Sequence, residues 1–307
     1  MTDTTLHHVA ISGQIGSGKS SVARRLAERL DARLYSTGGI QREIAKKRGM
    51  TTLELNLYAE KHPEIDQEID GFTMALGDAE HSFVIDSRLA WNFLERAFKV
   101  NLLVDHAVAV ERIMGDRQRG QIESYRSREE GIEEVAARRA SERRRFLDKY
   151  QVDVENPRNF DLILDTTQVS AEEATRIVHA ALDDPRPEGR RRPALRLCPC
   201  NLFPTRDYGD IEKTARGLVE AGVEPEKIQV IIVDGKVHIL DGHARVSAAI
   251  AQGHKLIAAE LAASEDEEAS LGISARGYAE DRTRKAWLEA WEQAHDLRFS
   301  TYPAVAR

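Results

Sequence analysis

The chain has 307 residues, 41% of them hydrophobic and 31% charged, so it is long enough for two modest domains with a core each. Two cysteines exclude a disulfide framework, and no apolar run is long enough to span a bilayer, so we expect a cytoplasmic protein without membrane insertion. The net charge of −7 disfavours a protein that coats nucleic acid by charge alone, although it leaves room for a local basic channel.

The first recognisable motif is GQIGSGKSS at residues 13–21, which matches the phosphate-binding loop pattern GxxxxGK[ST]. The apolar run before it predicts a strand, and the apolar positions after it fall on one helical face. In such a loop the backbone N–H groups point at the phosphates, Lys19 neutralises the transferred phosphoryl group and Ser20 binds Mg²⁺. The sequence therefore predicts binding of ATP and Mg²⁺ by Gly13, Gly16, Ser17, Gly18, Lys19, Ser20 and Ser21.

Four more short apolar runs follow, separated by segments of helix length. Strands that alternate with helices are typical of a parallel sheet with helices on both faces, so residues 1–183 are predicted to form an α/β kinase domain of the P-loop class. The predicted strands lie within residues 7–13, 32–39, 82–87, 98–105 and 160–167.

The remaining chain divides by composition. Residues 184–196 are rich in proline and arginine, which predicts a linker. Residues 197–263 predict a small α+β domain that contains a hairpin turning at Asp234-Gly235. Residues 264–307 begin with an acidic run and continue as a helical tail.

Arginines occupy the positions where a phosphate acceptor would be held. Arg42 follows the second predicted strand at a helix start, and Arg88 follows the third, where open α/β sheets bind ligands. A surface salt bridge would explain either arginine taken alone equally well. The segment between the fourth and fifth strands fits either a lid over the transferred group or a solvated charged helix, and its arginines include Arg117, Arg138 and Arg145.

Asp86 also requires an interpretation, because it stands at the end of the third predicted strand. A hydroxyl acceptor benefits from a carboxylate that takes its proton, whereas a phosphate acceptor does not need one. Asp86 is therefore either a general base or a residue that helps to hold Mg²⁺ through water.

The first 183 residues resemble the cytidylate kinase-like family, especially its short archaeal-type members. The resemblance lies in GQIGSGKSSVARRLAERL, YSTGGIQREIAKKRGM, HPEIDQEID, SRLAW, RRASERRRFLDKYQVD and FDLILDTT, in the same order. It implies contacts of Arg42 and Arg88 with the acceptor phosphate and lid arginines among Arg117, Arg138 and Arg145. We expect Lys19, Asp86, Arg88 and Arg145 to be the catalytic residues. Gly39 and Ser87 depart from the family pattern, so we expect an acceptor pocket unlike that of a plain CMP kinase.

The second domain contains LDGHAR, which follows a predicted strand and opens a helix, so its turn is a natural anion site. A purely structural turn is the alternative. Residues 201–253 resemble the ParB/sulfiredoxin superfamily, and the resemblance implies phosphate binding at Gly242, His243 and Arg245. Ala244 replaces the second histidine of the usual pattern and the turn has no cysteine, which excludes sulfiredoxin chemistry.

A kinase joined to a ParB-like domain resembles the phage kinases that phosphorylate 5-hydroxymethyluracil within DNA. This hypothesis has a flipped nucleotide that presents its backbone phosphate to Arg42 and Arg88 and its hydroxymethyl oxygen to Asp86. The partners would then be ATP and a pyrimidine nucleotide within DNA. The alternatives are a free CMP or dCMP kinase with a regulatory domain, a nucleotide-dependent binding switch of ParB type, and a kinase for free serine.

Overall fold

The structure is a computed structural model, and it describes residues 6–50, 55, 58, 62, 64–115, 127–183, 193–222, 224, 226–270 and 272–301, except for the side chain of Arg42. By its internal contacts the chain divides into two units. Unit 1 comprises Met1–Gly13, Gly18–Leu102 and Ser170–Arg186, and unit 2 comprises Gln14–Ser17, Leu103–Val169 and Pro187–Arg307.

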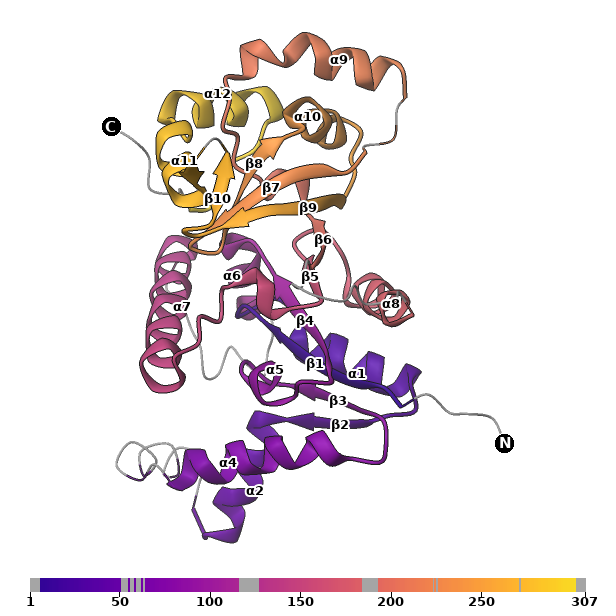
Figure 1. Cartoon of the computed structure of the whole chain (residues 1–307), viewed down its shortest axis with the longest axis vertical. Helices are drawn as coiled ribbons and strands as arrows, with labels where there is room; N and C mark the ends of the chain where they lie inside the picture. Colours follow the sequence, from indigo (N-terminus) through magenta and orange to yellow (C-terminus); the bar gives the residue numbers. More distant parts are fainter. Residues whose placement is uncertain are drawn as a thin grey trace. The chain divides into compact units, whose positions relative to one another are not determined.

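The sheet of unit 1 has the strand order β2-β3-β1-β4, and its described pairs are all parallel (Figure 1). The strands are β1 (His8–Gly13), β2 (Arg33–Ser36), β3 (Phe83–Asp86) and β4 (Phe98–Leu103). Because β1 and β3 are apolar at successive positions and lie inside the sheet, both faces of these strands are buried, as expected for a parallel sheet. Four of the strand predictions are confirmed in this unit.

Helices of unit 1 pack on this sheet. Val22, Ala23, Leu26 and Ala27 form the buried face of α1 (Lys19–Arg29), which explains the helical period of the sequence. Arg25 of α1 pairs with Glu172 of α8 (Ala171–Leu182) at 3.1 Å. The other described helices of this unit are α2 (Thr37–Lys47), α4 (Glu64–Ala75), η1 (Leu76–Asp78) and α5 (Ala90–Phe93).

The sheet of unit 2 has the order β5-β6-β9-β7-β8 and mixes parallel with antiparallel pairs. Its strands are β5 (Leu162–Asp165), β6 (Ala194–Leu197), β7 (Ile228–Val233), β8 (Lys236–Asp241) and β9 (Ile257–Ser264). The predicted fifth strand is confirmed as β5, and the hairpin of β7 and β8 turns at Asp234-Gly235 as predicted. Strand β10 (Glu268–Ser270) pairs separately with β11 (Ile273–Ser274).

The helices of unit 2 include α6 (His106–Gly115) and the 23-residue helix α7 (Arg128–Tyr150), which Ser127 caps with its side chain. Those that follow are η2 (Pro157–Asn159), η3 (Pro199–Asn201), η4 (Tyr208–Asp210), α9 (Glu212–Glu220), α10 (His243–Ala251), α11 (Ala275–Arg282) and α12 (Lys285–His295).

Two predicted segments can be compared with the elements that the structure describes. Residues 184–192 of the predicted linker lie outside the described part, but Ala194–Leu197 is strand β6, which pairs with both β5 and β9. Its alternation of exposed and buried residues is only four residues long and follows a proline- and arginine-rich stretch, so composition concealed it. The segment predicted as an acidic and then helical tail contains the helices α11 and α12. Strand β9 extends one residue past the predicted boundary, to Ser264, and Glu265 and Glu267 of the acidic run form ion pairs within unit 2.

The division into units also differs from the predicted domain boundary, because residues 103–169 group with the C-terminal part of the chain.

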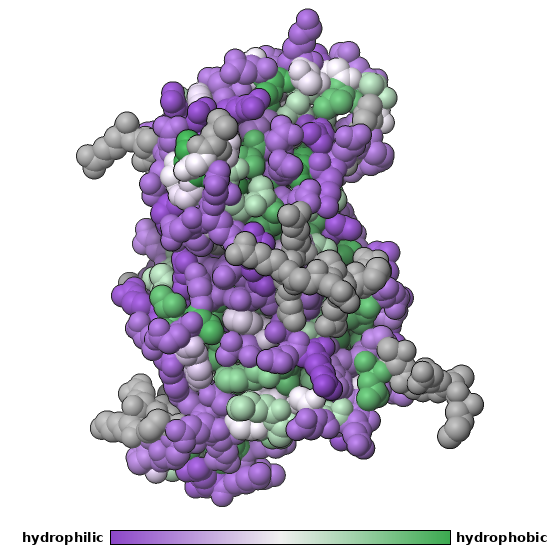
Figure 2. Space-filling model, in the orientation of Figure 1, coloured by the Kyte–Doolittle hydropathy of each residue, from purple (hydrophilic) through white to green (hydrophobic). Residues whose placement is uncertain are grey.

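None of the described helices is long and apolar enough to cross a membrane. The face of the molecule in Figure 2 is mostly hydrophilic, with apolar residues in scattered patches.

Candidate ATP site and acceptor residues

The predicted phosphate-binding loop joins β1 to α1, as the motif requires. Gly16 and Gly18 have positive φ angles of 77° and 84°, and Gly18 is the N-cap of α1. At Gly16 a Cβ atom would lie 2.7 Å from Ala109 of α6, so only glycine fits between the loop and that helix. The backbone of the loop therefore turns with no side chain at its closest approach to α6.

Two groups of the loop fit a phosphate ligand. Lys19 Nζ donates to the carbonyl oxygen of Gly13 at 2.8 Å, which keeps its ammonium group beside the loop. Ser17 is 2% exposed, and its Oγ has no hydrogen-bond partner in the described part of the chain. A buried hydroxyl group without a partner is costly, and a phosphate oxygen at the N-terminus of α1 would satisfy it. The observed loop thus agrees with the prediction of an ATP site.

A candidate Mg²⁺ site lies within unit 1. Ser20 Oγ, in the first turn of α1, donates to Asp86 Oδ2 at the end of β3 over 2.6 Å. A hydroxyl and a carboxylate are the hard oxygen ligands that Mg²⁺ prefers, directly or through its waters. The pair therefore fits Mg²⁺. The sequence predicted that Ser20 binds the metal, but it left Asp86 as either a general base or a residue that helps to hold Mg²⁺.

The acceptor side of unit 1 is partly described. Arg42 lies in the second turn of α2 rather than at its start, since Ser36 caps that helix and Thr37 begins it; the Arg42 side chain lies outside the described part. The carbonyl oxygen of Arg88 accepts from Ser12 Oγ and Trp91 Nε1, so the backbone after β3 is fixed at that residue.

Two hydroxyl groups, those of Ser87 and Thr37, are close in sequence to Arg88 and Arg42. Ser87 Oγ accepts hydrogen bonds from the N–H groups of Leu89 and Ala90. The departure from the family pattern at Ser87 thus has a structural role at the start of α5. Thr37 Oγ1 is buried without a hydrogen-bond partner among the described residues, and sequence reasoning did not single it out.

In unit 2 the loop residues Gln14–Ser17 are fixed by contacts that the sequence did not reveal. Arg112 of α6 donates to the carbonyl oxygens of Gly16 (3.3 Å) and Thr166 (2.6 Å), and burial lowers the pKa of its guanidinium group. Thr166 Oγ1 donates to the carbonyl oxygen of Ser17 at 3.0 Å. Gln14 accepts from the N–H of Val104. An arginine near the end of an apolar helix carries no sequence signal that would identify this role.

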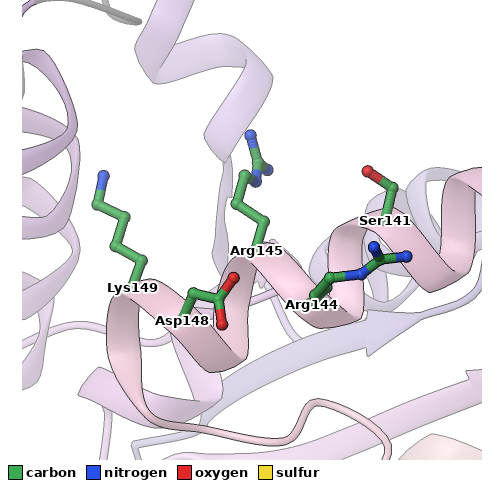
Figure 3. Close-up of a pocket in the computed structure, with 5 residues that line it drawn as sticks. All are labelled: Ser141, Arg144, Arg145, Asp148 and Lys149. Carbon is green, nitrogen blue, oxygen red and sulfur yellow. The ribbon is translucent and has the colours of Figure 1, made fainter.

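The predicted lid arginines have varied surroundings. Arg117 lies outside the described residues, and Arg138 pairs with Glu142 at 3.5 Å. Arg145 lies over the ring of Phe146, 5.1 Å from its centroid. Figure 3 shows Arg145 and Lys149 extending away from α7 on the same side, beside a shallow depression that Ser141, Arg144, Arg145, Asp148 and Lys149 line.

The second predicted anion site lies at the start of α10. Its turn borders a pocket of about 520 Å³. Within the chain Arg245 donates to the carbonyl oxygen of Lys227 and pairs with Asp241 at 3.1 Å. His243 is 3% exposed and bonds to Thr205, and burial lowers its pKa to about 4. Both side chains thus have partners, and a ligand would meet the N-terminus of α10 rather than a charged imidazole.

Comparison with known proteins agrees with this geometry. The model of the cytidylate kinase-like family matches residues 8–168. A cytidylate kinase of Pyrobaculum neutrophilum is 38% identical over 172 residues, which cover 55% of this chain and 89% of that protein. A cytidylate kinase of Pyrococcus furiosus is 36% identical, with 59% of this chain and 91% of that protein covered. An S-adenosylmethionine-dependent nucleotide dehydratase of Lacinutrix mariniflava is 32% identical over 55% of this chain, but only 34% of that protein is covered.

Proposed function

Because this chain belongs to the cytidylate kinase-like family and is an ATP-dependent kinase that uses Mg²⁺, we propose that it phosphorylates a pyrimidine nucleoside monophosphate such as CMP or dCMP. The observation that carries the choice of acceptor is the hydrogen bond between Ser20 and Asp86. It ties the carboxylate of Asp86 to the hydroxyl group expected to bind Mg²⁺, which favours the metal role over that of a general base. A monophosphate acceptor is already anionic and needs no base.

The roles of the chain's own residues follow from this chemistry. The loop binds the β- and γ-phosphates with its N–H groups and Lys19, while Arg42 and Arg88 hold the acceptor phosphate. Arg117, Arg138 and Arg145 are the candidates to neutralise charge as the phosphoryl group moves between two anions. Ser20 and Asp86 would hold Mg²⁺, and the metal would supply positive charge that offsets the charge of the ATP phosphates.

The second candidate acceptor is the hydroxymethyl group of 5-hydroxymethyl-deoxyuridine in DNA. The family match ends at residue 168, so the pocket at the start of α10 lies beyond it. A kinase for a small nucleotide has no evident need of a second ligand site, whereas an enzyme that holds a DNA strand would use one. In this role the N-terminus of α10 at Gly242, His243 and Arg245 would contact a phosphate of the strand.

One experiment separates these acceptors. The protein is incubated with Mg²⁺ and γ-labelled ATP, separately with CMP, dCMP, DNA that contains 5-hydroxymethyluracil, unmodified DNA and serine. We expect label in CDP or dCDP, and the loss of transfer in the variant Lys19→Met. Label on the modified DNA alone would replace the first proposal by the second. Hydrolysis of ATP with no labelled acceptor would instead favour a nucleotide-dependent binding switch.

A further inference from the structure

The helix α7 is tied to the C-terminal part of unit 2 by ion pairs. Arg143 donates to both carboxylate oxygens of Asp153 and to Asp234 at 3.0 Å, and it lies 3.7 Å from Glu265. Arg139, one helical turn earlier, bonds to Glu155 and to the carbonyl oxygen of Gly235. One face of α7 thus contacts the turn between β7 and β8.

A third arginine makes the best-formed pair of this set. Arg158, in η2, donates two hydrogen bonds of 2.6 Å to the carboxylate of Glu267. The side chains are 19% and 31% exposed, so water and salt screen this pair less than a surface pair. Paired hydrogen bonds between a guanidinium and a carboxylate fix orientation as well as distance. Asn159, also in η2, donates to the carbonyl oxygen of Asp153, whose carboxylate binds Arg143, so this pair is connected to α7. We call Arg139, Arg143, Arg158, Asp234, Glu265 and Glu267 the α7 network.

Asp234 and Gly235, in the turn between β7 and β8, both contact residues of this network. Asp234 has a φ of 47°, and its carboxylate bridges Arg143 and Arg276. Its N–H donates to Glu265. At Gly235, φ is 66°, and a Cβ atom would overlap the guanidinium group of Arg139. The turn therefore combines a glycine and a carboxylate at the two positions where α7 approaches it.

Val135, one helical turn before Arg139, continues this face of α7 towards the phosphate-binding loop. Ile15 of the loop, Val110 and Ile113 of α6 and Val135 of α7 form one buried cluster. Such a cluster transmits displacement, because protein interiors are closely packed and tolerate few voids. A shift of α7 would thus alter the packing under Ile15, next to the Gly16 backbone that Arg112 holds.

We infer that the C-terminal part of the chain positions the ATP-binding loop through the α7 network, so that Asp234, Glu265 and Glu267 are positioning residues for phosphoryl transfer. The three arginines lie within the family match at residues 8–168, and the three carboxylates lie beyond it. The C-terminal part thus holds a helix of the kinase through residues that the kinase itself does not supply. The inference concerns the binding of ATP and does not depend on which acceptor is used.

The test replaces the three carboxylates by amides in the full chain, as Asp234→Asn, Glu265→Gln and Glu267→Gln together. These changes keep the size of each side chain, and asparagine tolerates the positive φ of residue 234. The control is Glu289→Gln, which removes an exposed pair with Lys285 on α12. The affinity for ATP with Mg²⁺ is measured by titration calorimetry well below the unfolding temperature, with the folded fraction checked by circular dichroism.

We expect the triple variant to bind ATP about fivefold more weakly or worse, since couplings between sites commonly reach this size. The control should bind like the wild type. A folded triple variant with wild-type affinity would overturn the inference, because a purely structural role would lower the unfolding temperature alone. If the triple variant does not fold, Asp234→Asn and Glu267→Gln are compared singly, and unchanged affinity in both would overturn it equally.

Discussion

Ser20 Oγ donates a hydrogen bond of 2.6 Å to Asp86 Oδ2, which joins the first turn of α1 to the end of β3 across 66 residues of sequence. In an ATP-dependent kinase this pair stands where Mg²⁺ is expected. It gives the first prediction, because a metal role and a base role respond differently to added metal.

Replacement of Asp86 by asparagine removes the charge and keeps the shape. We expect the Mg²⁺ concentration for half-maximal activity to rise about tenfold or more, as is typical when a group that supports a metal is lost. Asp78→Asn, at an exposed position of η1, is the control and should leave the requirement unchanged. A loss of activity that excess Mg²⁺ does not relieve at all would point to a general base instead.

Gly16→Ala should damage the loop and the fold together. Its Cβ would lie 2.7 Å from Ala109, and φ is 77°, so the substitution is crowded and strained. We expect a loss of stability of about 1–3 kcal/mol and much weaker binding of ATP. Gly71→Ala in α4, where a Cβ meets nothing within 4 Å, should instead stabilise the protein by about 1 kcal/mol or less. Thermal unfolding and ATP titration of both variants test this contrast.

Arg112→Ala should loosen the loop from the end of β5. Arg112 donates to Gly16, Thr166 and Thr167, and these carbonyl oxygens would lose a charged donor. We expect a loss of stability of about 1.5–3 kcal/mol, with a raised KM for ATP. Arg112→Lys should restore little, because one ammonium group does not reproduce the planar fork of a guanidinium. Full rescue by lysine would show that only the charge matters.

Unit 2 should lose stability as the pH falls from about 6.5 towards 4. Burial lowers the pKa of His238 to about 3, and that of His106, His243 and His295 to about 4. The unfolded chain takes up these protons near pH 6.5, so the stability from neutral histidines is complete above that value and is lost as pH falls towards 4. For a buried group, a tenfold change in proton affinity between the unfolded and folded states is worth up to about 1.4 kcal/mol.

Chemical unfolding at pH 7, 5.5 and 4.5 measures this loss. Asp165 and Glu265, whose pKa values burial raises, act in the opposite direction. The variant His295→Phe keeps the ring contacts with Tyr208 and Trp291, and its stability should fall less steeply over the same interval. Stability that is constant from pH 7 to 4.5, or an equal slope in the variant, would contradict this assignment.

The sequence predicted those parts of the fold that depend on local pattern. Each of the strands β1 to β5, like the loop motif, is formed by one short stretch of sequence, so local pattern and spacing were sufficient to predict them. Strand β6 was not predicted, because its alternation of exposed and buried residues covers only four positions beside a proline- and arginine-rich stretch.

Contacts between distant segments could not be predicted in the same way. Arg143 and Asp234 are 91 residues apart, and Arg112 meets Thr166 across 54. Neither pair has a local signal, because charged residues on a helix usually face water. The segment that contains α7 was therefore predicted to be either a lid or a solvated charged helix, whereas Arg139 and Arg143 bind carboxylates of unit 2.

The most direct test of the proposed reaction is the ratio of products formed from ATP and CMP, or from ATP and dCMP, in the presence of Mg²⁺. Phosphoryl transfer to the monophosphate predicts one nucleoside diphosphate for each ADP derived from ATP, and neither product from the Lys19→Met variant. Formation of ADP by the wild type without any phosphorylated CMP or dCMP would contradict the proposal.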